Sequence, residues 1–284
     1  MKVYIINLDN EKKRWNAITD NYISSGINKE DIVRIPAIYG KELSISEKKK
    51  VCTEKGFKYC TNSMIGIFLS HQKAWRTFLE SGEEYCIISE DDVKITVDTK
   101  KKLDMLFLDI NDYDFDIMIL SYTIGGKPPK DYIAMDTFFK IFYKLCGFKL
   151  QKYKYISNDV IQPEFFTGLQ LYIISKKGAN VLLYHLNKVS YHIDVAISGN
   201  PYIKKLSLQN IYTKHVGWDD SSNNIGSNTQ LIPNIKYNGI DINWVLNMPI
   251  CKLHNIELNT FLIIKYIIVL IIILYLIRLG FSFS

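Results

Sequence analysis

Short apolar runs alternate with amphipathic segments along the first two thirds of the chain. Continuous apolar runs are typical of buried strands, and apolar residues three and four positions apart are typical of helices. Strands are predicted at residues 3–6, 32–35, 85–89, 115–120 and 168–174. Helices are predicted from Asn7 or Asn10, either of which could cap the helix, to about Ser25, and at 44–55, 64–79 and 176–186. This alternation predicts an α/β fold with a mainly parallel sheet and helices on both faces.

Residues 123–160 interrupt the alternation. They contain Gly125-Gly126 and Pro128-Pro129, together with several lysines and many aromatic residues. Because glycine and proline end regular elements, we predict an insertion or lid here. The main domain is predicted at residues 1–229, followed by a connector at 230–260.

The chain then becomes apolar on every face. Residues 261–277 read FLIIKYIIVLIIILYLI, with Lys265 as the one charged residue. A membrane-spanning helix needs about 20 apolar residues, and Lys265 and Arg278 could extend toward the two interfaces. A buried core helix is the alternative. We predict a transmembrane tail anchor at residues 261–283, so the protein would be a single-pass membrane protein with a cytosolic catalytic domain.

Composition fits a folded domain and narrows the choice of function. The 284 residues are 48% hydrophobic and 23% charged, which is ordinary for globular proteins. The net charge of +6 suits a phosphate-bearing ligand or an anionic membrane surface, and no basic tract indicates a nucleic-acid partner. The five cysteines form no CxxC pair, which disfavours a zinc site. The N-terminal apolar stretch is too short for a secretory signal, so reduced thiols are expected.

Three adjacent acids, Glu90, Asp91 and Asp92, follow the strand predicted at residues 85–89. In open α/β sheets, ligands bind beyond the carboxyl ends of strands. Mg²⁺ and Mn²⁺ prefer carboxylate oxygens together with substrate phosphates. Side chains alternate along an extended segment, so Glu90 and Asp92 would share one side and Asp91 the other. A Mg²⁺ or Mn²⁺ site is therefore one interpretation, and a solvated acidic turn is the other.

Other candidate residues carry weaker signals. Ser70-His71 falls on the helix predicted at 64–79, where His71 could simply pack against its neighbours. Asp194, in His192-Ile193-Asp194, could be a second acid near the sheet edge. His215 and the Trp218-Asp219-Asp220 triplet fall in a late, loop-rich region. The motifs GxxxxGK[ST], GxGxxG, GxSxG and HExxH are absent, which disfavours P-loop phosphotransfer, dinucleotide redox chemistry, α/β-hydrolase chemistry and zincin proteolysis.

Seven sequence blocks occur in a fixed order: VYIINLDNEKKRW, IPAIYG, IGIFLSHQKAW, CIISEDDV, FDIMIL, TGLQLYIISKKGANVLL and HIDVAIS. Together, over residues 2–225, they resemble glycosyltransferase family 25, which includes bacterial lipooligosaccharide galactosyltransferases and collagen galactosyltransferase domains. The resemblance implies a GT-A-like fold and metal-dependent transfer of a sugar with inversion. The donor would be a UDP-sugar, usually UDP-galactose, and the acceptor a hydroxyl on a glycan, a lipid-linked saccharide or a protein. It thereby implies lipopolysaccharide biosynthesis or protein glycosylation.

The resemblance also implies roles for particular residues. Asn7, Leu8, Asp9 and Arg14 would hold the nucleotide, and Ser70 and His71 would line the donor pocket. Glu90, Asp91 and Asp92 would form the family's Asp-x-Asp metal motif, with Asp92 on the metal and Glu90 supporting it or binding the sugar. Asp194 would be a metal ligand or the general base. As the base, Asp194 is our first candidate and Asp220 the second.

Two departures and two rival functions remain at this point. The 123–160 insertion is unlike the compact bacterial enzymes, and the late stretch QNIYTKHVGWDDSSNNIGSN matches only loosely. A metal-dependent phosphodiesterase or nuclease would usually hold two metal ions and need more acids than this one cluster supplies. A catalytically inactive, membrane-tethered binding or scaffold protein is the other rival, although the intact acids argue against it.

Overall fold

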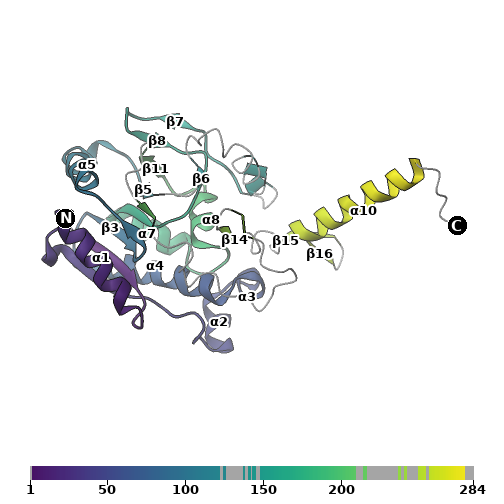
Figure 1. Cartoon of the computed structure of the whole chain (residues 1–284), viewed down its shortest axis with the longest axis horizontal. Coiled ribbons are helices and arrows are strands. Elements are labelled where there is room, and N and C mark those ends of the chain that lie inside the picture. Colours follow the sequence, from purple (N-terminus) through teal and green to yellow (C-terminus); the bar gives the residue numbers. More distant parts are fainter. Residues whose placement is uncertain are drawn as a thin grey trace.

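In the computed structural model of the chain, residues 2–121 and 148–208 are described continuously. Shorter described segments lie at 124–125, 137, 140–141, 143–144, 214–215, 236–237, 240–241, 249–253 and 256–278. One eight-stranded sheet dominates the described part, and helices cover it (Figure 1). The α/β class predicted from the sequence is confirmed.

The order of the strands across this sheet is β2-β1-β3-β10-β5-β11-β8-β7. Their bounds are β1 (Val3–Asn7), β2 (Ile32–Pro36), β3 (Tyr85–Glu90), β5 (Ile117–Ser121), β7 (Lys154–Tyr155), β8 (Val160–Gln162), β10 (Leu171–Ser175) and β11 (Lys205–Leu208). Among the described residues, four two-stranded pairs lie outside it: β4 (Val93–Lys94) with β12 (Lys214–His215), β6 (Ile124–Gly125) with β9 (Phe166–Thr167), β13 (Lys236–Tyr237) with β14 (Ile240–Asp241), and β15 (Pro249–Leu253) with β16 (Ile256–Asn259).

Six of the eight strands run in one direction, and two run the other way: β10 near the centre and β8 near one edge. β1 is parallel to both β2 and β3, and β5 is parallel to β11. β10 lies between β3 and β5 and is antiparallel to both, and β8 is antiparallel to β11. The beginning of β10 therefore lies at the same edge of the sheet as the ends of β1 and β3.

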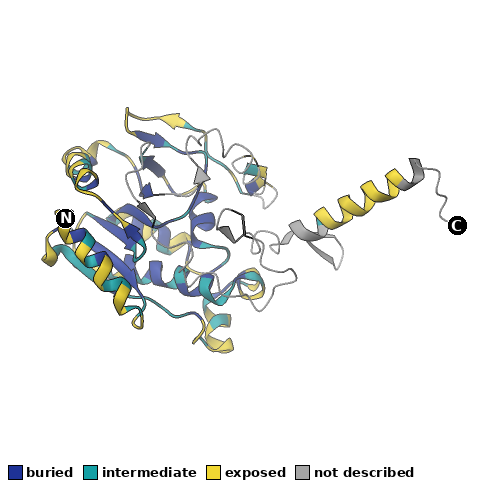
Figure 2. Ribbon diagram, in the orientation of Figure 1, coloured by how far each residue is buried: buried dark blue, intermediate teal, exposed yellow. Residues whose placement is uncertain are grey.

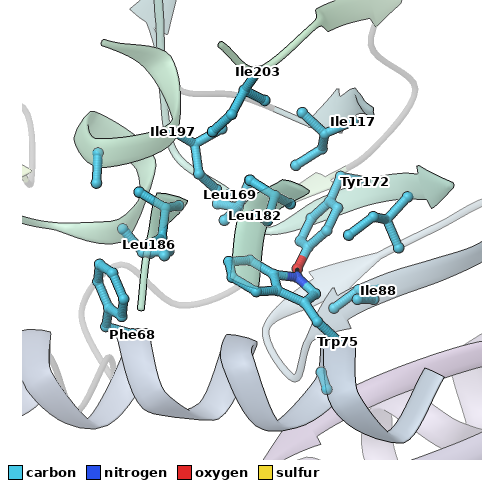
Figure 3. Close-up of a cluster of buried hydrophobic side chains, with 14 of the residues drawn as sticks. Phe68, Trp75, Ile88, Ile117, Leu169, Tyr172, Leu182, Leu186, Ile197 and Ile203 are labelled. Atoms are coloured by element: carbon cyan, nitrogen blue, oxygen red, sulfur yellow. Dashed lines mark hydrogen bonds between the residues drawn. The ribbon is translucent and has the colours of Figure 1, made fainter. Parts of the chain in front are cut away.

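Two hydrophobic cores fix the helices on the two faces of the sheet. The helices are α1 (Lys12–Ser24), α2 (Ile45–Val51), α3 (Glu54–Tyr59), α4 (Asn62–Ser81), α5 (Val97–Leu108), α7 (Lys176–His185), α8 (Ile193–Ser198) and α10 (Thr260–Arg278), with short 3₁₀ turns at Lys29–Asp31 and Ile110–Asp112. The first core joins α4, α7 and α8 to one face, and contains Phe68, Trp75 and Tyr172 (Figure 3). The second joins α1 and α5 to the other face. Both cores are dark in Figure 2.

Local hydrogen bonds explain most differences from the predicted helices. The helix predicted at 44–55 is two helices, because Ser44 caps α2 and Thr53 caps α3 with its side chain. α4 begins after the Thr61 cap and ends at Gly82, whose φ is 78°. The predicted cap of α1 by Asn7 or Asn10 is wrong: its N-cap is Glu11, without a side-chain cap.

Part of the predicted insertion at 123–160 belongs to the main body of the fold. β7 and β8 extend the sheet at one edge. Tyr143 is fully buried, and its hydroxyl donates a hydrogen bond to the carbonyl of Phe166. A lid function, and the domain boundaries at 229 and 260, stay predictions.

The C-terminal apolar run is helical over Thr260–Arg278, as α10. Within the residues that the structure describes, no helix is long and apolar enough to cross a membrane. The transmembrane helix predicted over residues 261–283 is therefore not supported.

Candidate active site

A pocket opens where β1, β2 and β3 end, at the edge of the sheet where ligands of α/β proteins usually bind. It is lined by Ile6, Leu8, Arg14, Ala37, Ile38, Tyr39, Gly40, Lys41, Ser63, Ile67, Ser70, His71, Glu90, Asp91 and Asp92. Its volume is about 720 Å³, counted to include its open mouth.

All three acids of the Glu90-Asp91-Asp92 cluster line this one pocket. The prediction that Asp91 faces away from its neighbours is wrong, because β3 ends at Glu90 and strand alternation ends with it. Glu90 Oε1 lies 3.4 Å from His71 Nε2, at the distance of a long hydrogen bond. Asp91 instead accepts a hydrogen bond from Asn7 and forms an ion pair with Arg14, at an N–O distance of 3.3 Å.

Asn7 is buried behind the part of the pocket lining that contains Leu8 and Arg14, which we call the first wall. Its Nδ2 donates to Asp91 Oδ2 at 2.7 Å, and its Oδ1 accepts from Arg34 Nε at 3.0 Å and Nη2 at 2.8 Å. Arg34 also pairs with Asp9, whose side chain is 75% exposed. The predicted nucleotide residues thus divide: Leu8 and Arg14 line the pocket, Asn7 supports it from behind, and Asp9 lies outside the pocket lining.

Asp92 has the least satisfied carboxylate in the cluster. Its Oδ1 is buried and has no hydrogen-bond partner among the described residues. Burial, reinforced by the charges of Glu90 and Asp91, raises the pKa of Asp92 to about 8. Burial also raises the pKa of Asp91, although the hydrogen bond from Asn7 and the charge of Arg14 oppose the shift. Such a buried, unsatisfied acid is unfavourable by itself and suits a cationic ligand.

The loop after β2 forms the second wall and packs tightly against α4. A Cβ on Gly40 would lie 1.7 Å from the carbonyl oxygen of Asn62, so only glycine fits there. Ser70 Oγ accepts from the backbone N–H of Ile38 at 2.8 Å and donates to the carbonyl of Gly66 at 2.7 Å. Ser70 lines the pocket and also fixes this loop, and a role in binding the donor stays a prediction.

His71 is buried in α4, and it also lines the pocket. Its Nδ1 lies 2.9 Å from the hydroxyl of Tyr172 on β10. The indole Nε1 of Trp75 donates to the same hydroxyl at 2.8 Å, and Figure 3 shows the two groups in contact. Burial raises the pKa of Tyr172 well above its ordinary value, so the hydroxyl keeps its proton.

Asp194 lies at the start of α8 and is fully engaged by hydrogen bonds. Its Oδ1 accepts from His192 Nδ1 at 2.5 Å and from the N–H of Val195, and its Oδ2 accepts from the N–H of Gly168 at 2.7 Å. Burial raises the pKa of Asp194, but His192 and these N–H groups outweigh burial and lower it overall. Asp194 is not among the residues that line the pocket.

A short turn connects Asp194 to the acid cluster. Gly168, with a φ of 90°, bonds to Asp194, and the carbonyl of Gln170, two residues on, accepts from the N–H of Glu90 at 2.8 Å. Burial lowers the pKa of His192, but the charge and hydrogen bond of Asp194, and more weakly the charge of Glu90, raise it overall. His192 and Glu90 are therefore within electrostatic range of each other.

Sequence reasoning missed several residues of this site. No catalytic motif pointed to Arg34, Lys41, Trp75, Tyr172 or His192, although the last three fall in the blocks IGIFLSHQKAW, TGLQLYIISKKGANVLL and HIDVAIS. Asp220, the second candidate base, lies outside the described residues. Across the part of the chain that the structure describes, no three His, Cys, Asp or Glu side chains converge as a metal site.

The fold and the acid-lined pocket together describe an α/β protein with a ligand site at the carboxyl ends of its parallel strands. A family model described as "Glycosyltransferase family 25 (LPS biosynthesis protein)" matches residues 1–197, and the chain belongs to this family. The match includes Glu90-Asp91-Asp92 and Asp194 and ends before Asp220. The resemblance seen in the sequence is thereby confirmed as far as residue 197.

Comparison with curated proteins finds no match. Among solved structures, the chain is similar to A197 from STIV, with 13% identity, a TM-score of 0.36, and coverage of 75% of this chain and 84% of that one. It is also similar to mannose-1-phosphate geranyltransferase from Thermus thermophilus, with 9% identity, a TM-score of 0.36, and coverage of 74% and 60% respectively. These likenesses are too distant to indicate function.

Proposed function

We propose that this glycosyltransferase moves a hexose, galactose in the first instance, from a UDP-sugar to a hydroxyl acceptor with inversion and with the help of Mn²⁺ or Mg²⁺. The observation that carries the proposal is the position of the acid cluster at the end of β3, on the wall of a pocket that Arg14 and Lys41 also line. These two cations suit the diphosphate of a nucleotide sugar.

The residues present fit a divalent ion. Asp92 offers a buried carboxylate oxygen without a hydrogen-bond partner in the described part, and Glu90 lines the same pocket. Mg²⁺ commonly binds one or two carboxylates and completes its coordination with water and substrate phosphates, so a third protein ligand is not required. When bound, the ion would neutralise charge on the leaving diphosphate as a Lewis acid.

The chain's own residues would orient the donor and accept the proton. The bonds from Asn7 to Arg34 and Asp91 hold the first wall, and Ser70 holds the second. For the proton of the acceptor hydroxyl we propose Asp194 acting with His192. The pair is hydrogen-bonded and lies across the Gly168 turn from Glu90. A positioned base of this kind contributes about 10²–10⁴-fold to the rate. Asp220 stays the second candidate.

The acceptor is proposed at the level of a class, a glycan, lipid-linked saccharide or protein hydroxyl. Membrane association is also proposed, with the catalytic domain on the cytosolic side. Its support is the apolar sequence of residues 261–277 and the exposed apolar side chains between Ile264 and Tyr275. Flotation of the full chain with liposomes tests it. A chain that stays with the soluble fraction would exclude this association.

The full chain should be screened against UDP-, GDP- and CMP-sugars, with Mn²⁺, Mg²⁺ or EDTA, and release of the nucleotide measured. Metal-dependent turnover of a UDP-sugar is expected. Binding without turnover of any nucleotide sugar would favour the inactive scaffold, and metal-dependent cleavage of phosphodiesters alone would favour the phosphodiesterase.

A further inference from the structure

Four side chains form a continuous hydrogen-bonded path from the hydrophobic core to the pocket. The path runs from Trp75 through Tyr172 and His71 to Glu90, with successive distances of 2.8, 2.9 and 3.4 Å. Trp75, Tyr172 and His71 are at most 1% exposed, so solvent does not supply alternative partners. Of the four, His71 and Glu90 line the pocket, and Glu90 does so from the end of β3.

The indole N–H of Trp75, at the start of the path, sets the direction of every hydrogen bond that follows. An indole N–H can only donate, so the Tyr172 oxygen accepts from Trp75. The Tyr172 hydroxyl hydrogen then needs an acceptor, and His71 Nδ1 is the one that the described residues provide. His71 Nδ1 therefore carries no proton. In a ring with one proton, that proton is then on Nε2, which can donate to Glu90 Oε1.

The two other states of His71 each leave a buried group unsatisfied. With the proton on Nδ1 alone, the lone pair of Nε2 would face the carboxylate of Glu90, which is repulsive. With protons on both nitrogens, Trp75 and His71 would both donate to Tyr172, and its hydroxyl hydrogen would have no acceptor among the described residues. Leaving a buried donor unsatisfied costs about 1–3 kcal/mol.

We propose that Trp75 and Tyr172 are positioning residues that act through His71: they fix its imidazole in the Nε2–H tautomer and so hold the Glu90 carboxylate in place. The proposal deepens the proposed function and rests on it for the meaning of Glu90. Hydrogen bonds that orient a carboxylate ligand typically change metal affinity or activity by about 10–100-fold when they are lost.

The tautomer itself can be observed without any assay of transfer. In ¹⁵N-labelled full-length protein, long-range ¹H–¹⁵N spectra distinguish protonated from unprotonated ring nitrogens, and the His71→Gln variant identifies the His71 signals. We expect an Nε2–H ring whose Nδ1 accepts a hydrogen bond. In Tyr172→Phe the Nδ1 signal should move to that of a nitrogen without a hydrogen bond. A proton on Nδ1 in the wild-type protein would overturn the proposal.

The two amide replacements of His71 form a matched pair. The side-chain nitrogen of Gln can occupy the position of Nε2, whereas that of Asn reaches only the position of Nδ1. Binding of Mn²⁺ alone, followed by electron paramagnetic resonance, should be within a few-fold of wild type in His71→Gln. It should fall by about 10-fold or more in His71→Asn and Tyr172→Phe. Equal affinities in all three variants would contradict the role of the path.

Trp75→Phe tests the far end of the path, because Trp75 has no hydrogen bond to His71 or Glu90. It should weaken Mn²⁺ binding less than Tyr172→Phe does. Phe68→Leu, in the same helix and core, is its control for lost packing and should leave Mn²⁺ affinity unchanged. Equal losses of Mn²⁺ affinity in Trp75→Phe and Phe68→Leu would mean that Trp75 acts through packing alone. The Nε2–H tautomer and the expected changes in Mn²⁺ affinity could be found while no sugar is transferred. In that case the proposed function fails, and the positioning role of Trp75 and Tyr172 stands.

Discussion

Asn7 and Asp91 are 84 positions apart in sequence, and their side chains are joined by a hydrogen bond of 2.7 Å. The bond connects the end of β1 to the residue that follows β3, two strands that are neighbours in the sheet. Because Asn7 also accepts two hydrogen bonds from Arg34, one buried amide fixes both the first wall of the pocket and the middle acid of the cluster.

Asn7→Asp should separate these two functions of Asn7. The new carboxylate can still accept hydrogen bonds from Arg34. It cannot donate a hydrogen bond to Asp91, and its negative charge repels the Asp91 carboxylate. We expect turnover of the donor to fall by at least about 10-fold, as for other lost partners of ligating groups, while the circular dichroism spectrum is unchanged. Asn111→Asp makes the same chemical change at an exposed residue that bonds to Tyr85 and should have wild-type turnover. Wild-type turnover in Asn7→Asp would refute a supporting role for Asn7.

Asp92→Asn should abolish metal-dependent turnover and stabilise the metal-free protein. The native state holds the proton of Asp92 more tightly than the unfolded chain does, since its pKa is raised to about 8. Ionisation therefore destabilises the native state progressively as the pH rises from about 4 toward 8. Asparagine removes this effect, so the free energy of unfolding at pH 7 should rise by on the order of 1 kcal/mol.

Urea unfolding in EDTA at pH 5 and pH 8 measures this change, and the gain should be larger at pH 8. Excess Mn²⁺ should stabilise the wild-type protein and leave Asp92→Asn unchanged. A variant that is less stable than wild type at both pH values would indicate a structural role for Asp92 instead of a metal site.

The His192–Asp194 pair should stabilise the protein most between about pH 4 and 6.5. Asp194 has a lowered pKa, so its contribution is present above its ordinary pKa of 3.8 and is lost as the pH falls through the lowered value. His192 has a raised pKa, so its contribution is present below 6.5 and is lost as the pH rises through the raised value.

Asp194→Asn should therefore lower the free energy of unfolding by about 1–3 kcal/mol at pH 5.5, and by less at pH 9. If Asp194 takes part in proton transfer with His192, the same variant should also reduce kcat by about 10²-fold or more. Stopped-flow nucleotide release and urea unfolding separate the two effects. An unchanged kcat would leave Asp220 as the candidate base.

Gly40→Ala should deform the second wall of the pocket. Its Cβ would clash with the carbonyl of Asn62 at 1.7 Å, so the loop after β2 must move away from α4. We expect a loss of stability of about 1–3 kcal/mol and a higher KM for the donor. Gly82→Ala is the control, because it meets no atom within 4 Å and strains only the left-handed end of α4. It should lower the melting temperature without changing KM.

Much of the fold follows from the sequence because the strands are short and almost wholly apolar. β1, β2 and β3 were predicted to within one residue, and the acids after β3 lie at the edge of the sheet where the pocket opens. Apolar runs do not encode direction, however, and nothing in residues 168–174 shows that β10 is antiparallel to its neighbours.

The predicted site residues were found by motif, and motifs favour residues that are close in sequence. Glu90, Asp91 and Asp92 were found for this reason. Tyr172 and Trp75 read as ordinary core residues, because their polar atoms matter only once β10 lies against α4. Arg34 was missed because its partner Asn7 belongs to another strand and was first interpreted as a helix cap.

The reversed strand β10 also determines when the protein can take shape during its synthesis. It fills the place between β3 and β5, although at least 49 residues separate it from either of them in sequence. Until residue 175 leaves the ribosome, β3 and β5 each present an open strand edge, and such edges invite pairing with other chains. The first half of the polypeptide therefore depends on a strand made later to join its two parts into one sheet.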